Sequence, residues 1–337
     1  MSPLVPVLVP LAATFVLLSS AGALAGGLLA RIVPAGSSAE ARIPSTTLRA
    51  LAVLAPWILA ALGCLALASP DPFTGCHCAL HGLHHPHLCL SHPAFALPLV
   101  GPAALVLGAW LIAVTPRLFR LAREVLASTR WAREIRRLPA QREGDIAFRL
   151  HDCGTPSAFT VGALSPVIVV DRTLWEHLSP DERRAVLHHE QGHVERGDGL
   201  TLLALRLCMA LSPVPLGARL LDAWRLAAEQ ACDLHAAAQL GDGNTVAAAL
   251  VSVEKLHAQH LATTPPHVPA LGVGAGAELE RRVLALLDTR PGPGEQRLGN
   301  DVLAALLVTL GAAALTVAWP GDTFHHAVET LIGLLIH

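Results

Sequence analysis

The chain of 337 residues has no tyrosine, a single lysine (Lys255) and few charged side chains, which make up 15% of the sequence. Without tyrosine, no phenol hydroxyl is available as a hydrogen-bond donor at a functional site. So little charge, together with 53% hydrophobic residues and a mean hydropathy of +0.50, excludes a pair of ordinary soluble domains. The composition indicates a membrane protein.

Four apolar runs are long enough to cross a bilayer, which takes about 20 helical residues. They are predicted as spans at residues 4–33, 50–69, 97–115 and 301–320. A cleaved signal peptide is the alternative for the first run, although this run lacks a positively charged start and a clear cleavage site.

Arginines are distributed unevenly among the segments between these runs. Three lie in residues 31–49, none in 70–96, and eight follow the third run. The positive-inside rule therefore places the first and third of these segments in the cytoplasm and predicts a multi-pass protein of the inner (cytoplasmic) membrane. The predicted organisation is a membrane region at 1–115 with an outer loop at 70–96, a cytoplasmic domain at 116–300 that begins with a basic juxtamembrane helix at 116–138, and a short outer tail at 321–337.

The cytoplasmic segment carries signals for both strands and helices. Ser179-Pro-Asp-Glu182 predicts a helix start, with a Ser cap, Pro in the first position and Glu three residues after the cap. Gly197 is a natural stop for this helix. Residues 200–211 predict an apolar helix, either buried in the domain or lying against the membrane, and 216–240 a further helix. A small sheet is predicted from three β-rich pieces, at 145–150, 158–161 and 167–170.

The helix after Ser179 contains the order His-Glu-x-x-His. Because His189 and His193 are four residues apart, they lie on one helix face and can take two corners of a zinc tetrahedron. A catalytic zinc needs a third protein ligand, for which Glu229 is the candidate. Glu190 is expected to act as the base that moves a proton to the leaving amine. Asp233, one turn after Glu229, is placed to orient a histidine ligand. The alternatives are a chance match for the string and an exposed carboxylate for Glu229.

Five segments in this order resemble the BlaR/MecR-type integral membrane metallopeptidases: Ser157–Gly162, Pro166–Val170, Leu178–Asp198, Glu229–Asp233 and Glu278–Leu287. The resemblance implies a mostly α membrane protein whose cytoplasmic α+β domain is zincin-like, of the gluzincin type, with a small sheet. It implies one catalytic Zn²⁺ on His189, His193 and Glu229, with Glu190 as the base. It also implies that the strand near 158–161 pairs with substrate as a sheet edge.

In that family the protease cuts itself or a winged-helix repressor after an external signal. The resemblance therefore implies a zinc metalloendopeptidase that cleaves a cytoplasmic protein in transmembrane signalling and so acts as an antirepressor. Such a protein contacts membrane lipid but no nucleic acid directly. A homodimer is possible. The β-lactam receptors carry a penicillin-binding domain after the last span, whereas residues 321–337 hold none, so β-lactam sensing by that route is not expected. An HtpX-type quality-control peptidase and a catalytically silent zinc-containing receptor are the alternatives.

The outer loop is rich in cysteine and histidine. Residues 76–92 hold three cysteines and six histidines, a density that suits copper or zinc and suggests metal sensing. The alternative is a disulfide of Cys89 with Cys76 or Cys78, because an extracytoplasmic compartment is oxidising. The candidate sensing residues are Cys76, His77, Cys78, His81, His84, His85, His87, Cys89 and His92.

Overall fold

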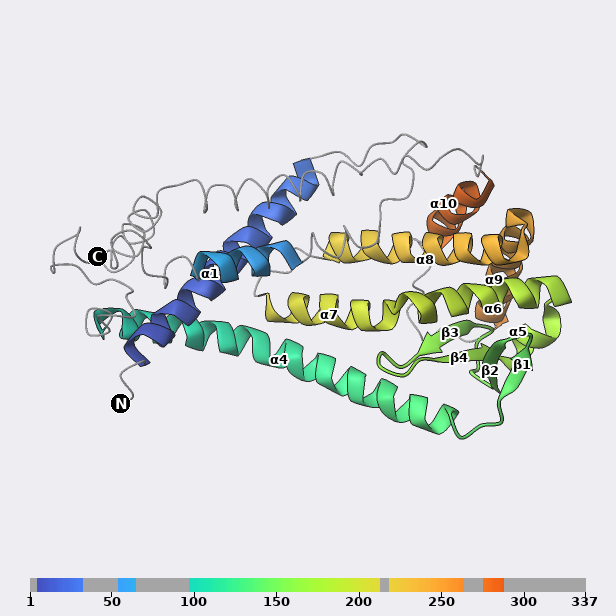
Figure 1. Ribbon diagram of the computed structural model, residues 1–337, viewed down its shortest axis with the longest axis horizontal. Helices are drawn as coiled ribbons and strands as arrows, with labels where there is room; N and C mark the ends of the chain where they lie inside the picture. Colours follow the sequence, from blue (N-terminus) through green and yellow to red (C-terminus); the bar gives the residue numbers. More distant parts are fainter. Residues whose placement is uncertain (1–4, 33–53, 65–96, 213–217, 264–274, 288–337) are drawn as a thin grey trace.

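The computed structural model describes residues 5–32, 54–64, 97–212, 218–263 and 275–287. A long helix, α4 (Leu97–Ile135), runs along one side of the molecule, and α7 (Asp198–Leu211) and α8 (Ala218–Leu240) extend beside it (Figure 1). The sheet and its covering helices lie at one end, whereas α1 (Val5–Ile32) crosses α4 near the other. Within the described residues the protein is mostly helical, as predicted, with one small sheet.

Two of the described helices are long and apolar enough to cross a membrane, by length and composition. The candidate spans are Val5–Ala23 in α1 and Leu99–Ile135 in α4. The helix Leu54–Cys64, within the predicted second run, is apolar but shorter. The predicted fourth run at 301–320, the outer loop and the outer tail lie outside the described residues. These helices support membrane association.

The third apolar run and the basic segment after it form one helix. Sequence analysis treats 97–115 and 116–138 as two segments, but α4 continues through Pro116. Proline removes one backbone donor from the helix interior. The leucines, alanines and arginines around it are good helix formers, and they carry the helix across this position. The apolar run and the domain that contains the sheet are therefore joined by one continuous helix rather than by a loop.

The sheet has four strands in the order β1-β2-β4-β3. β2 and β4 are parallel, whereas the outer strands β1 and β3 pair antiparallel with their neighbours. Three of the strands match the predicted β-rich pieces, and β1 is an additional short strand. β3 lies at one edge of the sheet. The strands are β1 (Gln141–Glu143), β2 (Ile146–His151), β3 (Ala158–Val161) and β4 (Val167–Asp171).

Both faces of the sheet are covered by helices. Ile168 and Val170 of β4 pack with Leu187 of α6 (Pro180–Arg196) in one buried cluster. Val169, which points to the opposite face because strand side chains alternate, packs against Ala132 at the end of α4. A short helix that the sequence analysis does not identify, α5 (Arg172–His177), follows β4 and is capped by Asp171. The sheet thus ties α4 to α6.

The start and the end of α6 follow the sequence signals. The Glu182 amide donates to Ser179 Oγ at 3.3 Å, and the Ser179 amide donates to Glu182 Oε2 at 2.8 Å, which completes a capping box. Gly197 ends the helix with a φ of 65°, a left-handed conformation that glycine adopts without strain. Because α7 begins directly after Gly197, α6 and α7 follow one another with a single-residue break.

Ser179→Ala is expected to destabilise the domain that contains α6 by about 1 kcal/mol, because it leaves a backbone donor of α6 without its acceptor. Chemical denaturation of the purified protein, followed by circular dichroism, measures the loss. Ser179→Asp supplies another acceptor and is expected to retain most of the stability. Equal losses in the two variants would contradict a capping role.

α6 packs against α8 and α9 (Gly243–Thr263), and α10 (Ala275–Leu287) packs in turn against α8 and α9. The approach of α6 to α8 is unusually close, since a Cβ placed on Gly192 would lie 3.2 Å from Cys232 Sγ. Only a glycine allows this spacing without a shift of one helix. The close approach brings a carboxylate of α8 within reach of the histidines of α6.

Candidate metal centre

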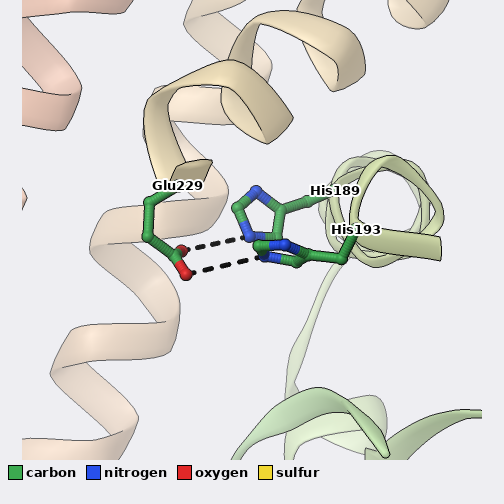
Figure 2. Close-up of side chains that lie close together, drawn as sticks. All are labelled: His189, His193 and Glu229. Atoms are coloured by element: carbon green, nitrogen blue, oxygen red, sulfur yellow. Dashed lines mark ion pairs between the residues drawn. The ribbon is translucent and has the colours of Figure 1, made fainter. Parts of the chain in front are cut away.

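Three side chains from two helices converge at one point. His189 and His193 project from α6 toward Glu229 of α8 (Figure 2). His189 Nε2 lies 3.3 Å from Glu229 Oε2, and His193 Nε2 lies 3.5 Å from Glu229 Oε1. The three ligand atoms, one from each residue, all lie within 4.8 Å of one another. The structure therefore brings together all three residues that the sequence proposes as metal ligands.

The donor set and its spacing fit a zinc ion. Zinc takes nitrogen and oxygen ligands at about 2.0–2.2 Å in a tetrahedron, which separates two ligand atoms by about 3.3–3.5 Å. The two nitrogen-to-oxygen distances, 3.3 and 3.5 Å, match this separation. Three protein ligands leave a fourth position free for water or substrate, which is the pattern of a catalytic rather than a structural site.

Each histidine has a carboxylate behind it. His189 Nδ1 lies 2.9 Å from Asp233 Oδ1, and His193 Nδ1 lies 2.9 Å from Asp198 Oδ2. A carboxylate at Nδ1 fixes the ring orientation and leaves Nε2 as the atom that faces the centre. Asp233 and Asp198 are both buried. Asp233 thus lies where the sequence places it, and Asp198 is a second residue of the same kind that sequence analysis missed.

Arg282 of α10 connects two of the carboxylates. Its Nε and Nη2 donate to the two carboxylate oxygens of Asp233, each at 2.8 Å, and its Nη1 lies 3.1 Å from Glu229 Oε2. A bidentate arginine holds a carboxylate in one plane and position. Arg282 therefore fixes both the proposed third ligand and the residue that orients His189.

These contacts set the charge of the metal-free site. Burial lowers the pKa of His189, but Asp233 and Glu229 more than offset this effect and raise it to about 10. Burial raises the pKa of Glu229, but His189 and Arg282 bring it down to about 2. Without metal, a protonated His189 therefore faces ionised carboxylates. A divalent cation replaces that proton on binding, because a histidine ligand is neutral.

Glu190 lies next to the ligands and is 5% exposed. Thr160 of β3 donates a hydrogen bond from Oγ1 to Glu190 Oε2 at 2.9 Å. This bond joins the candidate base to the edge strand of the sheet and restricts its rotation. The hydroxyl of Thr160 is a further residue of the site that sequence analysis did not identify.

A cavity of about 940 Å³ lies over these residues. Its lining comes from β3, α4, α6, α7, α8, α9 and α10 and includes the three candidate metal ligands and Glu190.

Cys232 lies behind the site without the properties of a ligand. Its Sγ is 3.7 Å from Asp198 Oδ2, so His193, Asp198 and Cys232 form a second group with ligand atoms close together. Burial strongly raises the pKa of the Cys232 thiol, which keeps it protonated. The thiol donates to Asp198 and packs against Gly192, so Cys232 has a packing role.

Of the missed residues, Asp198 carries a weak local signal and Arg282 carries none. Asp198 follows the predicted helix stop at Gly197, and the left-handed turn there brings the chain back toward His193. Arg282 belongs to the predicted closing helix, but nothing in its spacing connects it to residues about fifty positions earlier. The nine outer-loop residues proposed for metal sensing, from Cys76 to His92, lie outside the described residues.

Arg282→Gln is expected to weaken zinc binding by about 10-fold to 100-fold, because Asp233 and Glu229 lose the side chain that positions them. Removing a positive charge near the metal would by itself raise the affinity for zinc, so the sign of the measured change in affinity shows which of the two effects is larger. Arg282→Lys keeps the charge but not the bidentate geometry and is expected to fall in between. Competition titration with a chelator measures the affinity.

Arg281→Gln is the matched control for this substitution. Arg281 is the exposed neighbour whose Nε donates to the backbone of its own helix at Ala277 O. Its replacement is expected to leave the affinity unchanged. Zinc binding as tight in Arg282→Gln as in the wild type would contradict the positioning role of Arg282.

A His-Glu-x-x-His helix facing a carboxylate of a second helix, beside the edge strand of a small sheet, is the arrangement of a metallopeptidase. Residues 137–240 match the family model described as Peptidase family M48, whose members depend on a metal. No curated protein and no solved structure matches the chain significantly. The match covers the sheet and the helices that carry His189, His193 and Glu229. It supports a metallopeptidase and does not distinguish a BlaR/MecR-type antirepressor from an HtpX-type peptidase.

Proposed function

We propose that the protein is a membrane-anchored, zinc-dependent endopeptidase. The observation that carries this proposal is the convergence of His189, His193 and Glu229 beside Glu190, with ligand atoms at tetrahedral spacing. A zinc ion held by these three residues would polarise the scissile carbonyl and lower the pKa of the attacking water.

Glu190 supplies the proton transfer. Its carboxylate takes the proton from the attacking water and delivers it to the leaving nitrogen, and Thr160 holds one of its oxygens during this exchange. Asp233 and Asp198 keep the two histidine rings in place. Arg282 keeps Asp233 and Glu229 in place from the side of α10.

The substrate is a polypeptide in extended conformation. β3 is an edge strand, so the backbone groups along its outer side are not used within the sheet. A peptide can pair with this edge and pass over the metal centre. Because β3 lines the same cavity as the metal ligands, a segment that pairs with this strand lies beside the metal centre. Pairing along a strand suits an internal segment of a chain, which favours an endopeptidase over an enzyme that trims chain ends.

The domain acts on the cytoplasmic side of the inner membrane, on a cytoplasmic protein. The arginine distribution around the apolar runs supports this side. The resemblance to the BlaR/MecR-type peptidases supports a winged-helix repressor, or the protein itself, as the target and transmembrane signalling as the role. The cysteine- and histidine-rich outer loop is then a candidate sensor on the opposite side.

The test compares cells that produce the wild type with cells that produce Glu190→Gln. New protein N-termini are identified by mass spectrometry in both, and the zinc content of both purified proteins is measured. A repressor fragment found only with the wild type supports the signalling role. Fragments of many membrane proteins would favour an HtpX-type peptidase. Signalling unchanged in the variant would favour a silent receptor and overturn the proposal.

A further inference from the structure

The edge strand β3 has side chains on two faces of the sheet. Thr160 points toward α6, because its hydroxyl donates to Glu190 Oε2. Side chains alternate along a strand, so Phe159 points to the opposite face, where α4 ends. On that face Ala132 of α4 packs with Val161 of β3 in one buried cluster. A segment paired with β3 therefore has the metal centre on one side and α4 on the other.

Phe159 is supported by an aromatic ring of α4. Trp131 stacks on it, with the ring centroids 5.3 Å apart and the ring planes at 24°. The Trp131 ring also meets His151 of β2 edge-on, at a centroid distance of 6.3 Å, so two strands fix its position. Both arrangements are favourable for aromatic pairs. Phe159 is only partly buried and lines the cavity that contains the metal ligands, so part of its ring is available to a ligand.

α4 continues from this aromatic pair along the wall of the cavity. Ser128 lies one turn before Trp131, on the same side of the helix, and it lines the cavity together with Val125. Because serine is small, this part of the helix leaves room beside the edge strand. Glu124, the charged residue that α4 adds to the cavity lining, is paired with Arg206. The surface offered to a ligand here is therefore mainly apolar.

We propose that Phe159, backed by Trp131 and bordered by Ser128, forms a subsite for one aromatic or large aliphatic side chain of the substrate. This inference rests on the proposed function and deepens it, because it names a side chain that the peptidase selects. The selected residue is the one that faces Phe159 across the edge of β3, where directly opposed side chains contact each other. The two residues beside it in the substrate point toward α6.

The subsite and the metal centre belong to different elements. Phe159 lies on β3 and its neighbours Trp131 and Ser128 on α4, whereas the metal ligands lie on α6 and α8. A change in the subsite is therefore expected to alter which substrates are cut and to leave zinc binding unaffected. α4 also contains the third apolar run, so one helix joins the membrane region to the selection of substrate.

The test uses the full-length, zinc-loaded protein in phospholipid vesicles. Short unstructured peptides, varied at one position at a time, serve as substrates, and mass spectrometry of the fragments gives kcat/KM. At one position phenylalanine or leucine is expected to be preferred over alanine by about threefold to tenfold, which is the usual contribution of an aromatic or apolar pair across a strand edge. This position defines a pair of test peptides, one with phenylalanine and one with alanine.

Ser128→Trp is expected to fill the subsite and to reduce the phenylalanine-to-alanine ratio of kcat/KM to about one, mainly through KM for the phenylalanine peptide. The alanine peptide needs no room there and is expected to stay within about twofold of the wild type. Ala127→Trp is the matched control, because Ala127 is exposed and lies outside the cavity lining. Equal ratios in these two variants would overturn the subsite.

Trp131 is a positioning residue, since it acts through Phe159. Trp131→Ala is expected to lower the ratio at unchanged zinc content, whereas Trp131→Phe keeps a ring against Phe159 and is expected to retain most of it. A merely structural role would lower kcat for both peptides and leave the ratio unchanged, which would overturn the assignment.

The two proposals fail in different ways. If the wild type cuts peptides but shows no aromatic or aliphatic preference that depends on Ser128, the subsite is overturned and the proposed function stands. If zinc-loaded wild type cuts no peptide, the proposed function is overturned and the subsite with it.

Discussion

Replacing Glu190 with glutamine is expected to slow peptide hydrolysis by about 10²–10⁴-fold, the usual contribution of a general base. Glutamine has nearly the same size and keeps an oxygen for the Thr160 hydroxyl, but it cannot take a proton. The metal ligands are untouched, so zinc binding is expected to remain. Turnover of an unfolded protein substrate and zinc per protein, measured on the same preparation, test both statements.

Glu195→Gln is the matched control for the Glu190 substitution. Glu195 lies on the same helix, and its side chain is 50% exposed. The same chemical change there is expected to leave turnover within about twofold of the wild type, as surface substitutions usually do. Full activity in Glu190→Gln, or an equal loss in both variants, would rule out Glu190 as the base.

Glu229→Ala is expected to abolish zinc binding at stoichiometric concentrations. Loss of a residue that merely orients a ligand costs about 10-fold to 100-fold in affinity, so loss of a ligand should cost more. The effect also appears in stability, because zinc at about 1,000 times its dissociation constant stabilises the wild type by about 4 kcal/mol. Thermal unfolding with and without zinc is therefore expected to show a shift in the wild type and none in the variant.

Glu254→Ala controls for the removal of a carboxylate from the same cavity. Glu254 lines the cavity from α9 and is not among the residues that could hold the metal. Its replacement is expected to preserve zinc binding and the stabilisation by zinc. If Glu229→Ala bound zinc as tightly as Glu254→Ala, a different residue would have to be the third ligand.

The part of the site on α6 could be predicted because neighbouring residues in the sequence determine it. The cap at Ser179 and the stop at Gly197 define α6, and the four-residue spacing then places His189 and His193 on one face. On the second helix the same spacing places Asp233 one turn after Glu229 and on the same face, but which histidine Asp233 meets is shown only by the structure. These predictions depend on helix geometry, which fixes directions within a few turns.

Contacts between distant elements could not be predicted in this way. Arg282 reaches Asp233 only because α10 packs against α8, and the sequence does not specify that packing. β1 has three exposed residues and therefore lacks the alternation of buried and exposed positions that marks a strand. At Pro116 the sequence changes from apolar to arginine-rich, and proline commonly ends a helix, so the sequence predicts a helix boundary there although α4 continues.

The position of β3 at the sheet edge also bears on which proteins the proposed peptidase would cut. Its four residues span about 13 Å, and a target segment that pairs with them would have to present free backbone groups over that length. In a segment within a stable helix or sheet these backbone groups are already hydrogen-bonded, so they become available only when the segment unfolds locally. The rate of cleavage is then governed by the free energy of local unfolding in the target, so that a stable protein with a suitable sequence escapes while a locally unfolded one is cut.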